Sequence, residues 1–146
     1  MKQVRDLIFN QDLTVISKNQ TVLDAARIMA EKNIGAVPVV EGDRVVGIFS
    51  ERDIMKRVVA KNLNPQKTTV EQVMTTELVV AAPQETIDHV ESRMKQHGIR
   101  HLPIIDDDKL IGIVSLRDLI DAELSEKDVE LQMMTAYIHY IPPDMS

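Results

Sequence analysis

The apolar positions of the chain follow a fixed order of elements. In residues 21–33, TVLDAARIMAEKN, apolar side chains recur at helical spacing after a threonine that suits an N-cap. Residues 36–50, AVPVVEGDRVVGIFS, form two β-branched runs around an acidic glycine turn, which is typical of a β-hairpin. A short strand over residues 13–16 precedes the helix, and a second helix begins after Asp53. The pattern therefore predicts a β-α-β-β-α unit.

The same unit is written again 65 positions later without a gap. Thr21 matches Thr86, Pro38 matches Pro103, and the motif SERD at residues 50–53 matches SLRD at residues 115–118. A single unit of this size buries too little surface to be stable alone. We therefore expect an α/β fold in which two β-α-β-β-α repeats pack sheet to sheet with pseudo-twofold symmetry.

The boundaries follow from where the repeat starts and stops. One module is expected across residues 1–146, with repeat 1 over 4–60, repeat 2 over 70–124 and a polar connecting loop over 61–69. Residues 125–141 predict one more helix, capped by Ser125 with Asp128, whose apolar stripe is too wide for a helix surrounded by water. This helix would either fold back on its own core or form a dimer contact, and we favour the dimer contact.

The two Ser-x-Arg-Asp motifs carry the candidate chemistry. Serine and aspartate at this spacing come close to a capping box, which is a purely structural role. That role leaves Arg52 and Arg117 unexplained, because the helix dipole disfavours a cation in the first turn. Free amides at a helix start, a serine hydroxyl and a guanidinium together suit a phosphate, and an aspartate suits the diol of a ribose. The motifs therefore indicate a nucleotide site.

An apolar slot for the base and two further cations complete the predicted site. The slot is expected to be aliphatic, formed by Ile16, Ala36, Val37, Ala81 and Leu102. Arg100 and His101 stand in the second copy, where the first copy has Gly35 and Ala36. We therefore expect the two sites to differ, with the second copy holding phosphates better.

The repeated LPI or VPV before the hairpin, and the G-h-h-S-x-x-D after it (h for an apolar residue), resemble a tandem pair of cystathionine-β-synthase (CBS) domains. The resemblance covers residues 4–124 and is similar to small stand-alone CBS-pair proteins. It implies a disc-like homodimer of pairs with a cleft between the repeats. The cleft of such pairs binds adenosine compounds such as AMP, ADP, ATP or NAD(H), and in some members S-adenosylmethionine.

The resemblance also implies roles for residues of the motifs. Asp53 and Asp118 would hold the ribose, and Ser50 and Ser115 would lie near the phosphate or ribose. The complete set of candidate ligand-binding residues is Ile16, Ala36, Val37, Pro38, Ser50, Arg52, Asp53, Ala81, Arg100, His101, Leu102, Pro103, Ser115, Arg117 and Asp118.

Composition narrows the function classes. A net charge of -6 argues against nucleic acid or an anionic membrane as a partner, since both attract a surplus of Lys and Arg. The start of the chain has no apolar stretch of signal-peptide length, and no apolar run approaches a membrane span, so a cytoplasmic protein is expected. Cysteine is absent, which removes disulfides and thiolate catalysis.

The residues indicate neither a catalytic nor a metal site. His97 and His101 are separated by Gly98, a helix C-terminal residue, and the acidic run at 106–108 lies at a hairpin turn, so neither predicts a metal site. No nucleophile with an adjacent base and no glycine-rich phosphate loop is recognisable. We expect a non-enzymatic, nucleotide-sensing regulatory module that acts on an unknown regulated protein. The alternative is a dimerisation or protein-interaction module without a physiological nucleotide.

Overall fold

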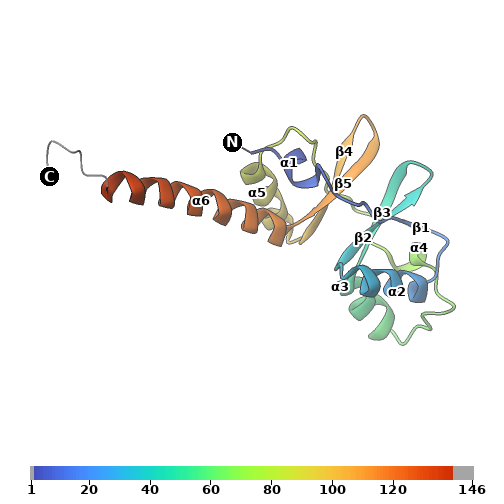
Figure 1. The fold of residues 1–146 in the computed structure, drawn as a ribbon. Helices are drawn as coiled ribbons and strands as arrows, with labels where there is room; N and C mark the ends of the chain where they lie inside the picture. The colour runs from blue at the N-terminus through green and yellow to red at the C-terminus, as the bar shows by residue number, and fades with distance from the viewer. Residues whose placement is uncertain (1, 140–146) are drawn as a thin grey trace, which may run out of the picture.

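The computed structural model describes residues 2–139, and side chains as far as residue 135. Its helices and strands follow the order expected for two repeats (Figure 1). The first repeat contains α1 (Arg5–Ile8), β1 (Ile16–Ser17), α2 (Val22–Lys32), β2 (Ala36–Glu41), β3 (Arg44–Ser50), α3 (Glu51–Asp53) and η1 (Ile54–Val59). The second contains α4 (Val70–Val73), α5 (Ile87–His97), β4 (His101–Asp106), β5 (Lys109–Ser115) and α6 (Leu116–His139).

The two copies of the sheet differ in extent. In the first repeat β1 pairs in parallel with β2, and β2 pairs antiparallel with β3, so the strand order is β1-β2-β3. In the second repeat β4 and β5 form a two-stranded sheet, and the expected strand over residues 78–82 is reduced to one parallel bridge from Ala81 to Ile104. The amide of Ala82 instead donates to Glu85 Oε2 at 2.8 Å, and Pro83 has no amide to donate.

Capping residues fix the helices where the sequence pattern places them. Thr21 caps α2, accepting from the Asp24 amide at 3.2 Å while the Asp24 carboxylate accepts from the Thr21 amide at 3.4 Å. Gly98 ends α5 with φ 63, the left-handed conformation that glycine adopts without strain. These caps position the start of each hairpin, because β2 and β4 begin three residues after their C-caps, Asn33 and Gly98.

The helices that follow the hairpins differ from the expectation. After Asp53 the first repeat forms a π-helix, with Ala60 N bonded to Met55 O at 2.9 Å, five residues back. In the second repeat the predicted helix after Asp118 and the predicted helix over 125–141 are one helix, α6, as far as residue 139. Ser125 is therefore not an N-cap, because the helix runs through it without interruption.

The short helices α1 and α4 lie across the pseudo-twofold axis. Val4 and Ile8 belong to the core of the second repeat, whereas Val70, Val73 and Met74 belong to the core of the first. The glycine of each hairpin makes room for this crossing. A Cβ on Gly112 would lie 2.8 Å from Ile8 Cδ1, and one on Gly47 would lie 2.5 Å from Met74 Sδ. Each repeat therefore completes its core with a helix from the other copy's sequence.

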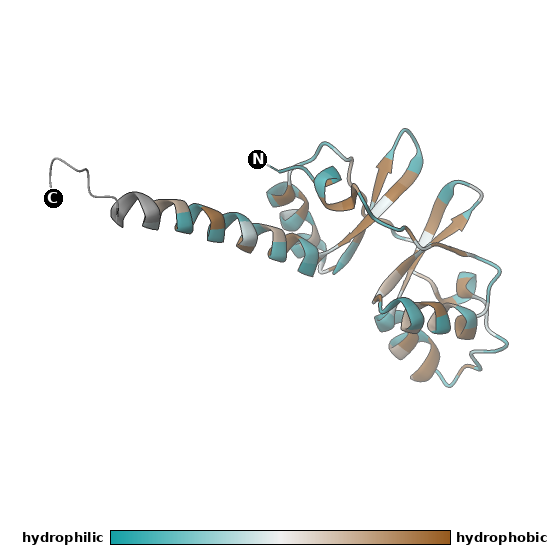
Figure 2. Cartoon of the chain, viewed as in Figure 1, coloured by the Kyte–Doolittle hydropathy of each residue, from teal (hydrophilic) through white to brown (hydrophobic). Residues whose placement is uncertain are grey.

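The distal part of α6 leaves the body of the molecule (Figure 1). Its first turns pack on α5 and β5, and Leu119 is fully buried there. Further along the helix Leu124, Val129, Leu131, Met133 and Met134 are between 53% and 69% exposed. Figure 2 shows these apolar turns interleaved with polar ones along the helix. The described part of α6 does not fold back on the core, which excludes one of the two expected roles for this segment. No helix within residues 2–139 is both long and apolar enough to cross a membrane.

Candidate functional site

Two hollows lie between the repeats, one at each Ser-x-Arg-Asp motif. The hollow at the first motif has a volume of about 480 Å³ and is lined by residues that include Ser50, Arg52 and Asp53. The hollow at the second motif has a volume of about 960 Å³ and is lined by residues that include Ser115, Arg117 and Asp118. Both volumes are in the range of small-molecule sites.

The structure brings nine of the fifteen candidate residues to the hollows and places the other six in the core. The nine are Ala36, Ser50, Arg52, Asp53, Arg100, His101, Ser115, Arg117 and Asp118. The other six are buried on the strands or next to them and line neither hollow: Ile16, Val37, Pro38, Ala81, Leu102 and Pro103. The aliphatic slot predicted for the base thus lies one layer deeper than the surface of the hollows.

Other apolar side chains line the hollows in place of those six. Ile48, Met55 and Ile99 line the smaller hollow, and Ile34, Ile113 and Ile120 are among the residues lining the larger one. The sequence contains a usable signal for part of this set. Ile48 and Ile113 occupy equivalent positions in the motif, where side chains alternate with those of the buried Phe49 and Val114.

Arg52 and Arg117 lie at the hollows, as the sequence predicts. Each stands in the first turn after its motif serine, is exposed, and lines its own hollow. In the described part of the chain neither guanidinium forms an ion pair with a carboxylate. The two arginines are therefore available to an anion that enters from solvent.

Asp118 presents a free carboxylate oxygen to the larger hollow. Its Oδ2 accepts from the Ser115 amide at 3.0 Å, and its own amide donates to Ser115 Oγ at 3.0 Å. Within residues 2–139 no protein group hydrogen-bonds its Oδ1. The side chain is held in place by the cap while one oxygen stays open to a ligand hydroxyl, because Asp118 is exposed.

Asp53 is engaged by the protein on both oxygens. Its Oδ2 accepts from the Ser50 amide at 3.0 Å and from Ser50 Oγ at 3.2 Å. Its Oδ1 accepts from Thr75 Oγ1 at 3.1 Å and lies 3.7 Å from Arg57 Nε. The side chain of Asp53 is only 7% exposed. The equivalent motif residues therefore present different chemistry to the two hollows.

The segment that follows α4 is what closes over Asp53. Thr75 exchanges two backbone hydrogen bonds with Ile48, both at 2.9 Å. Arg57 Nη1 donates to the carbonyl oxygens of Val73 at 3.3 Å and Met74 at 2.9 Å. In the second repeat the side chain of Gln11 replaces the backbone exchange, donating to Ile113 O at 2.8 Å and accepting from Ile113 N at 2.9 Å. Sequence analysis missed these contacts because they join residues remote in the chain.

Arg100 and His101 line both hollows. The wall shared by the two hollows consists of Gly35, Ala36, Glu51, Arg100 and His101. The two cations of the second copy therefore stand at the first motif as well as at the second. The reason is the pseudo-twofold arrangement, which sets the start of β2 opposite the start of β4, so residues of each copy reach both sites.

The surroundings of His101 disfavour its protonated form. Burial lowers the pKa of its imidazole, and the nearby Asp118 and Glu51 carboxylates oppose this effect only in part. A Cβ on Gly35 would lie 3.4 Å from both His101 Cε1 and Glu51 Oε1, so ring and carboxylate sit close together over this glycine. The shared wall thus contains one permanent cation, Arg100, and one carboxylate, Glu51.

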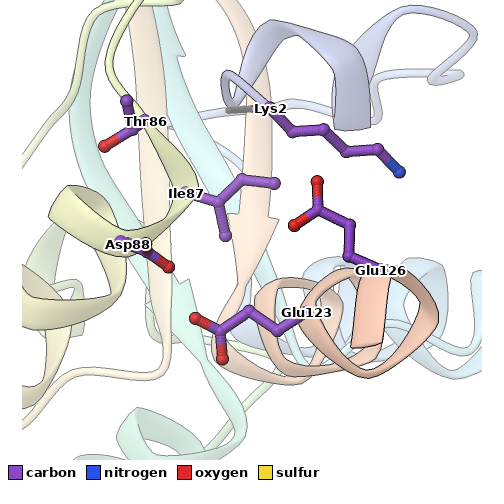
Figure 3. A pocket seen from close by; sticks show the side chains of 6 residues that line it. All are labelled: Lys2, Thr86, Ile87, Asp88, Glu123 and Glu126. Carbon is purple, nitrogen blue, oxygen red and sulfur yellow. The ribbon is translucent and has the colours of Figure 1, made fainter. Parts of the chain in front are cut away.

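A separate, smaller hollow of about 20 Å³ lies between the start of α5 and α6 (Figure 3). Beside it the carboxylates of Asp88, Glu91 and Glu123 lie within 4.8 Å of one another. Glu91 also pairs with Lys95 at 2.8 Å. Hydrogen bonds to the Glu91 and Asp88 carboxylates raise the pKa of Glu123 to about 7. The sequence pattern predicts no metal site and gives no sign of this grouping, because its members lie on two helices that are separate in the chain.

Comparison with known proteins places the fold in a family. The CBS domain model matches residues 4–60 and 70–125. The CBS domain-containing protein YhcV of Bacillus subtilis is 42% identical over 127 residues, covering 87% of this chain and 89% of that protein. A putative signal-transduction protein with CBS domains from Burkholderia ambifaria superimposes with a TM-score of 0.80 at 35% identity, covering 85% of this chain and 95% of that one.

A further solved structure contains ligands. The CBS domain pair of protein MJ0100, in complex with 5'-methylthioadenosine and S-adenosyl-L-methionine, superimposes with a TM-score of 0.74 at 30% identity. The superposition covers 87% of this chain and 98% of that chain.

Proposed function

The chain belongs to the CBS-domain family, and from this premise we propose that it is a non-catalytic regulatory module that binds an adenosine compound between its repeats. The ligands considered are AMP, ADP, ATP and NAD(H). Binding would bring the two repeats closer together, provided that the ligand has a higher affinity for the closed arrangement than for the open one. A ligand shifts a conformational equilibrium only by such a difference in affinity.

The observation that carries this proposal is the composition of the larger hollow. Arg117 supplies a guanidinium and Asp118 supplies a carboxylate oxygen at the same helix entrance, and neither group has a partner among the described residues. The first suits a phosphate and the second suits a ribose hydroxyl. Ile34, Ile113 and Ile120 add apolar surface for a base. Such a set of few polar groups in a partly apolar hollow is typical of ligand sites.

The ligands of the MJ0100 structure support the adenosine part of the proposal. Both of its bound compounds contain adenosine, and they differ in the group attached at the 5' carbon. Which group this chain's ligand carries at its 5' carbon depends on the charges that line the hollows.

Isothermal titration with AMP, ATP and NADH tests the proposal. We expect heat of binding, and a rise in melting temperature, with at least one of the three. Native mass spectrometry of the purified protein would show whether an adenosine compound is carried through purification. The absence of heat and of a thermal shift with every compound at millimolar concentration would contradict the proposal.

The exposed apolar residues of α6 favour a second function, association of two copies of the chain. Val129, Leu131, Met133 and Met134 lie on a helix that projects from the body, and a second copy would bury them. Light scattering should then give the mass of a homodimer. Double substitution Leu131→Lys with Met134→Lys should return a monomer that keeps its fold, since neither side chain is part of either core. A monomeric wild-type protein would contradict this function.

A further inference from the structure

The charges that line the hollows do not favour a polyanion. In the larger hollow Arg100 and Arg117 are opposed by Glu51, Asp118 and Asp121, which gives one more carboxylate than guanidinium. Burial lowers the pKa of the His101 imidazole, which disfavours a further positive charge there. A site that holds a triphosphate ordinarily concentrates positive charge around it.

The residues that line the smaller hollow have equal numbers of positive and negative charges. Its two guanidinium groups, Arg52 and Arg100, face two carboxylates, Glu51 and Asp53. Asp53 is already held by the protein, whereas the Glu51 side chain is exposed, and its carboxylate forms no ion pair or hydrogen bond within the described part of the chain. Glu51 is therefore the uncompensated carboxylate common to both hollows.

A purely structural role does not account for Glu51. A carboxylate in a first turn is favoured by the helix dipole. The equivalent residue of the second motif, however, is Leu116, and its helix starts with the same serine and aspartate contacts. The start of the helix therefore does not need an acid at this position. Glu51 therefore gives the first repeat a negative charge where the second repeat has the uncharged Leu116, and this charge lies in the wall that the two hollows share.

We propose that Glu51 selects ligands by charge, admitting an adenosine compound that carries one or two negative charges in preference to a nucleoside triphosphate. The inference rests on the proposed function and specifies its ligand class. A 5'-monophosphate, or the pyrophosphate diester of a dinucleotide, can be matched by the arginine of one motif together with Arg100. Each further phosphate charge must be placed near the Glu51 carboxylate, and at such close range solvent and salt screen the repulsion only in part.

The test is a charge series. AMP, ADP and ATP are titrated calorimetrically at one ionic strength without divalent cations, using wild type, Glu51→Gln and Glu51→Leu. We expect the wild-type affinity to fall from AMP to ATP. Removal of the carboxylate should raise the ATP affinity about tenfold and the AMP affinity less than about threefold. The control is Glu31→Gln on α2, which removes an exposed carboxylate that lines neither hollow and should leave the series unchanged.

The outcomes separate the two proposals. Tighter wild-type binding of ATP than of AMP, or an equal gain for all three nucleotides in Glu51→Gln, would overturn charge selection and leave nucleotide binding intact. Failure of all adenosine compounds to bind the wild type would overturn both. Magnesium ions should restore part of the ATP affinity in the wild type, because they neutralise charge on the phosphates, and less of it in Glu51→Gln.

Discussion

The two Ser-x-Arg-Asp motifs have the same residues at the same spacing, but their aspartates differ in what they can bind. Asp53 is buried and bonded on both oxygens, whereas Asp118 is exposed and keeps one oxygen free of hydrogen bonds from residues 2–139. The difference arises outside the motifs. At the second motif, the positions equivalent to Thr75 and Arg57, which hold Asp53, are Asn10 and Ala122. The repeated motif thus specifies the start of the helix, and the residues around it determine whether the aspartate carboxylate is available to a ligand.

The largest expected effect separates the two aspartates. Asp118→Ala should weaken nucleotide binding by about 2 kcal/mol, roughly thirtyfold, because a charged hydrogen bond to the ligand is lost. Asp53→Ala should leave the affinity nearly unchanged and lower the melting temperature more, because Thr75 and Arg57 lose their partner. Titration calorimetry and thermal unfolding measure the two quantities. Equal losses of affinity in both variants would show that the first site also binds ligand.

The hairpin glycines offer a second comparison. Gly112→Ala should destabilise the protein by about 2 kcal/mol, because the new methyl group would lie 2.9 Å from Ile8 Cβ, close to the backbone of α1. Gly47→Ala should destabilise the protein by a similar amount, since the flexible thioether of Met74 can move aside but the Thr75 carbonyl oxygen, 3.0 Å from the new methyl group, belongs to the backbone. Urea unfolding measures both free energies. The double variant Gly112→Ala with Ile8→Ala should lose less free energy of unfolding than the two single variants together. If the two losses simply add, the contact with Ile8 is not the cause.

Thr75→Val should sharpen the distinction between the motifs. It removes the hydroxyl that donates to Asp53 and retains the shape of the side chain, so a loss of about 1 kcal/mol of stability is expected. Nucleotide affinity should be unchanged if the ligand binds at Asp118. Thr76→Val, at the adjacent exposed position, is the control and should change neither quantity. A second equivalent of bound nucleotide in Thr75→Val would instead show that the threonine closes the first site.

The smallest expected effect concerns the carboxylates between α5 and α6. Asp88, Glu91 and Glu123 stand where the first repeat has Leu23, Ala26 and Val58. Since the pKa of Glu123 is raised to about 7, from an ordinary value of 4.5, the folded state holds the proton more tightly than the unfolded state. Stability is therefore lost as the pH rises from 4.5 to 7.

Glu123→Gln removes that loss. We expect its melting temperature to exceed that of the wild type by about 2 °C at pH 8, with no gain at pH 4. Glu126→Gln, one turn further along α6, provides the matched control, since it lies outside the carboxylate cluster. A gain of equal size at both pH values would mean that repulsion among the carboxylates is not responsible.

The sequence predicted the parts of the structure that local chemistry determines. The 65-residue offset relates α2 to α5 and β2–β3 to β4–β5, and the caps at Thr21 and Gly98 lie where expected. The positions of Arg52 and Arg117 at the hollows also follow from the motif, because a residue two places after a cap lies in the first turn.

Features that depend on contacts between the copies could not be predicted in this way. Arg100 and Gly35 occupy equivalent positions of the two copies, yet both line both hollows, because the copies meet around the pseudo-twofold axis. Most residues predicted for the base slot are buried beneath the surface of the hollows, because apolar character does not tell which face of a strand such as β2 meets the hollow. The continuity of α6 was missed because Ser125 with Asp128 resembles a cap, although no break in the helix follows from a cap residue alone.

The crossing of α1 and α4 has a consequence for the history of the chain. Each repeat borrows an apolar helix from the other, so a protein with a single copy would have left Gly47 or Gly112 facing water. Two identical ancestral chains could have met this need by exchanging their leading segments, as in a domain-swapped dimer. Fusion of the two genes would then have placed both exchanged segments in one chain. The two halves could afterwards diverge at residues such as Glu51 and Leu116.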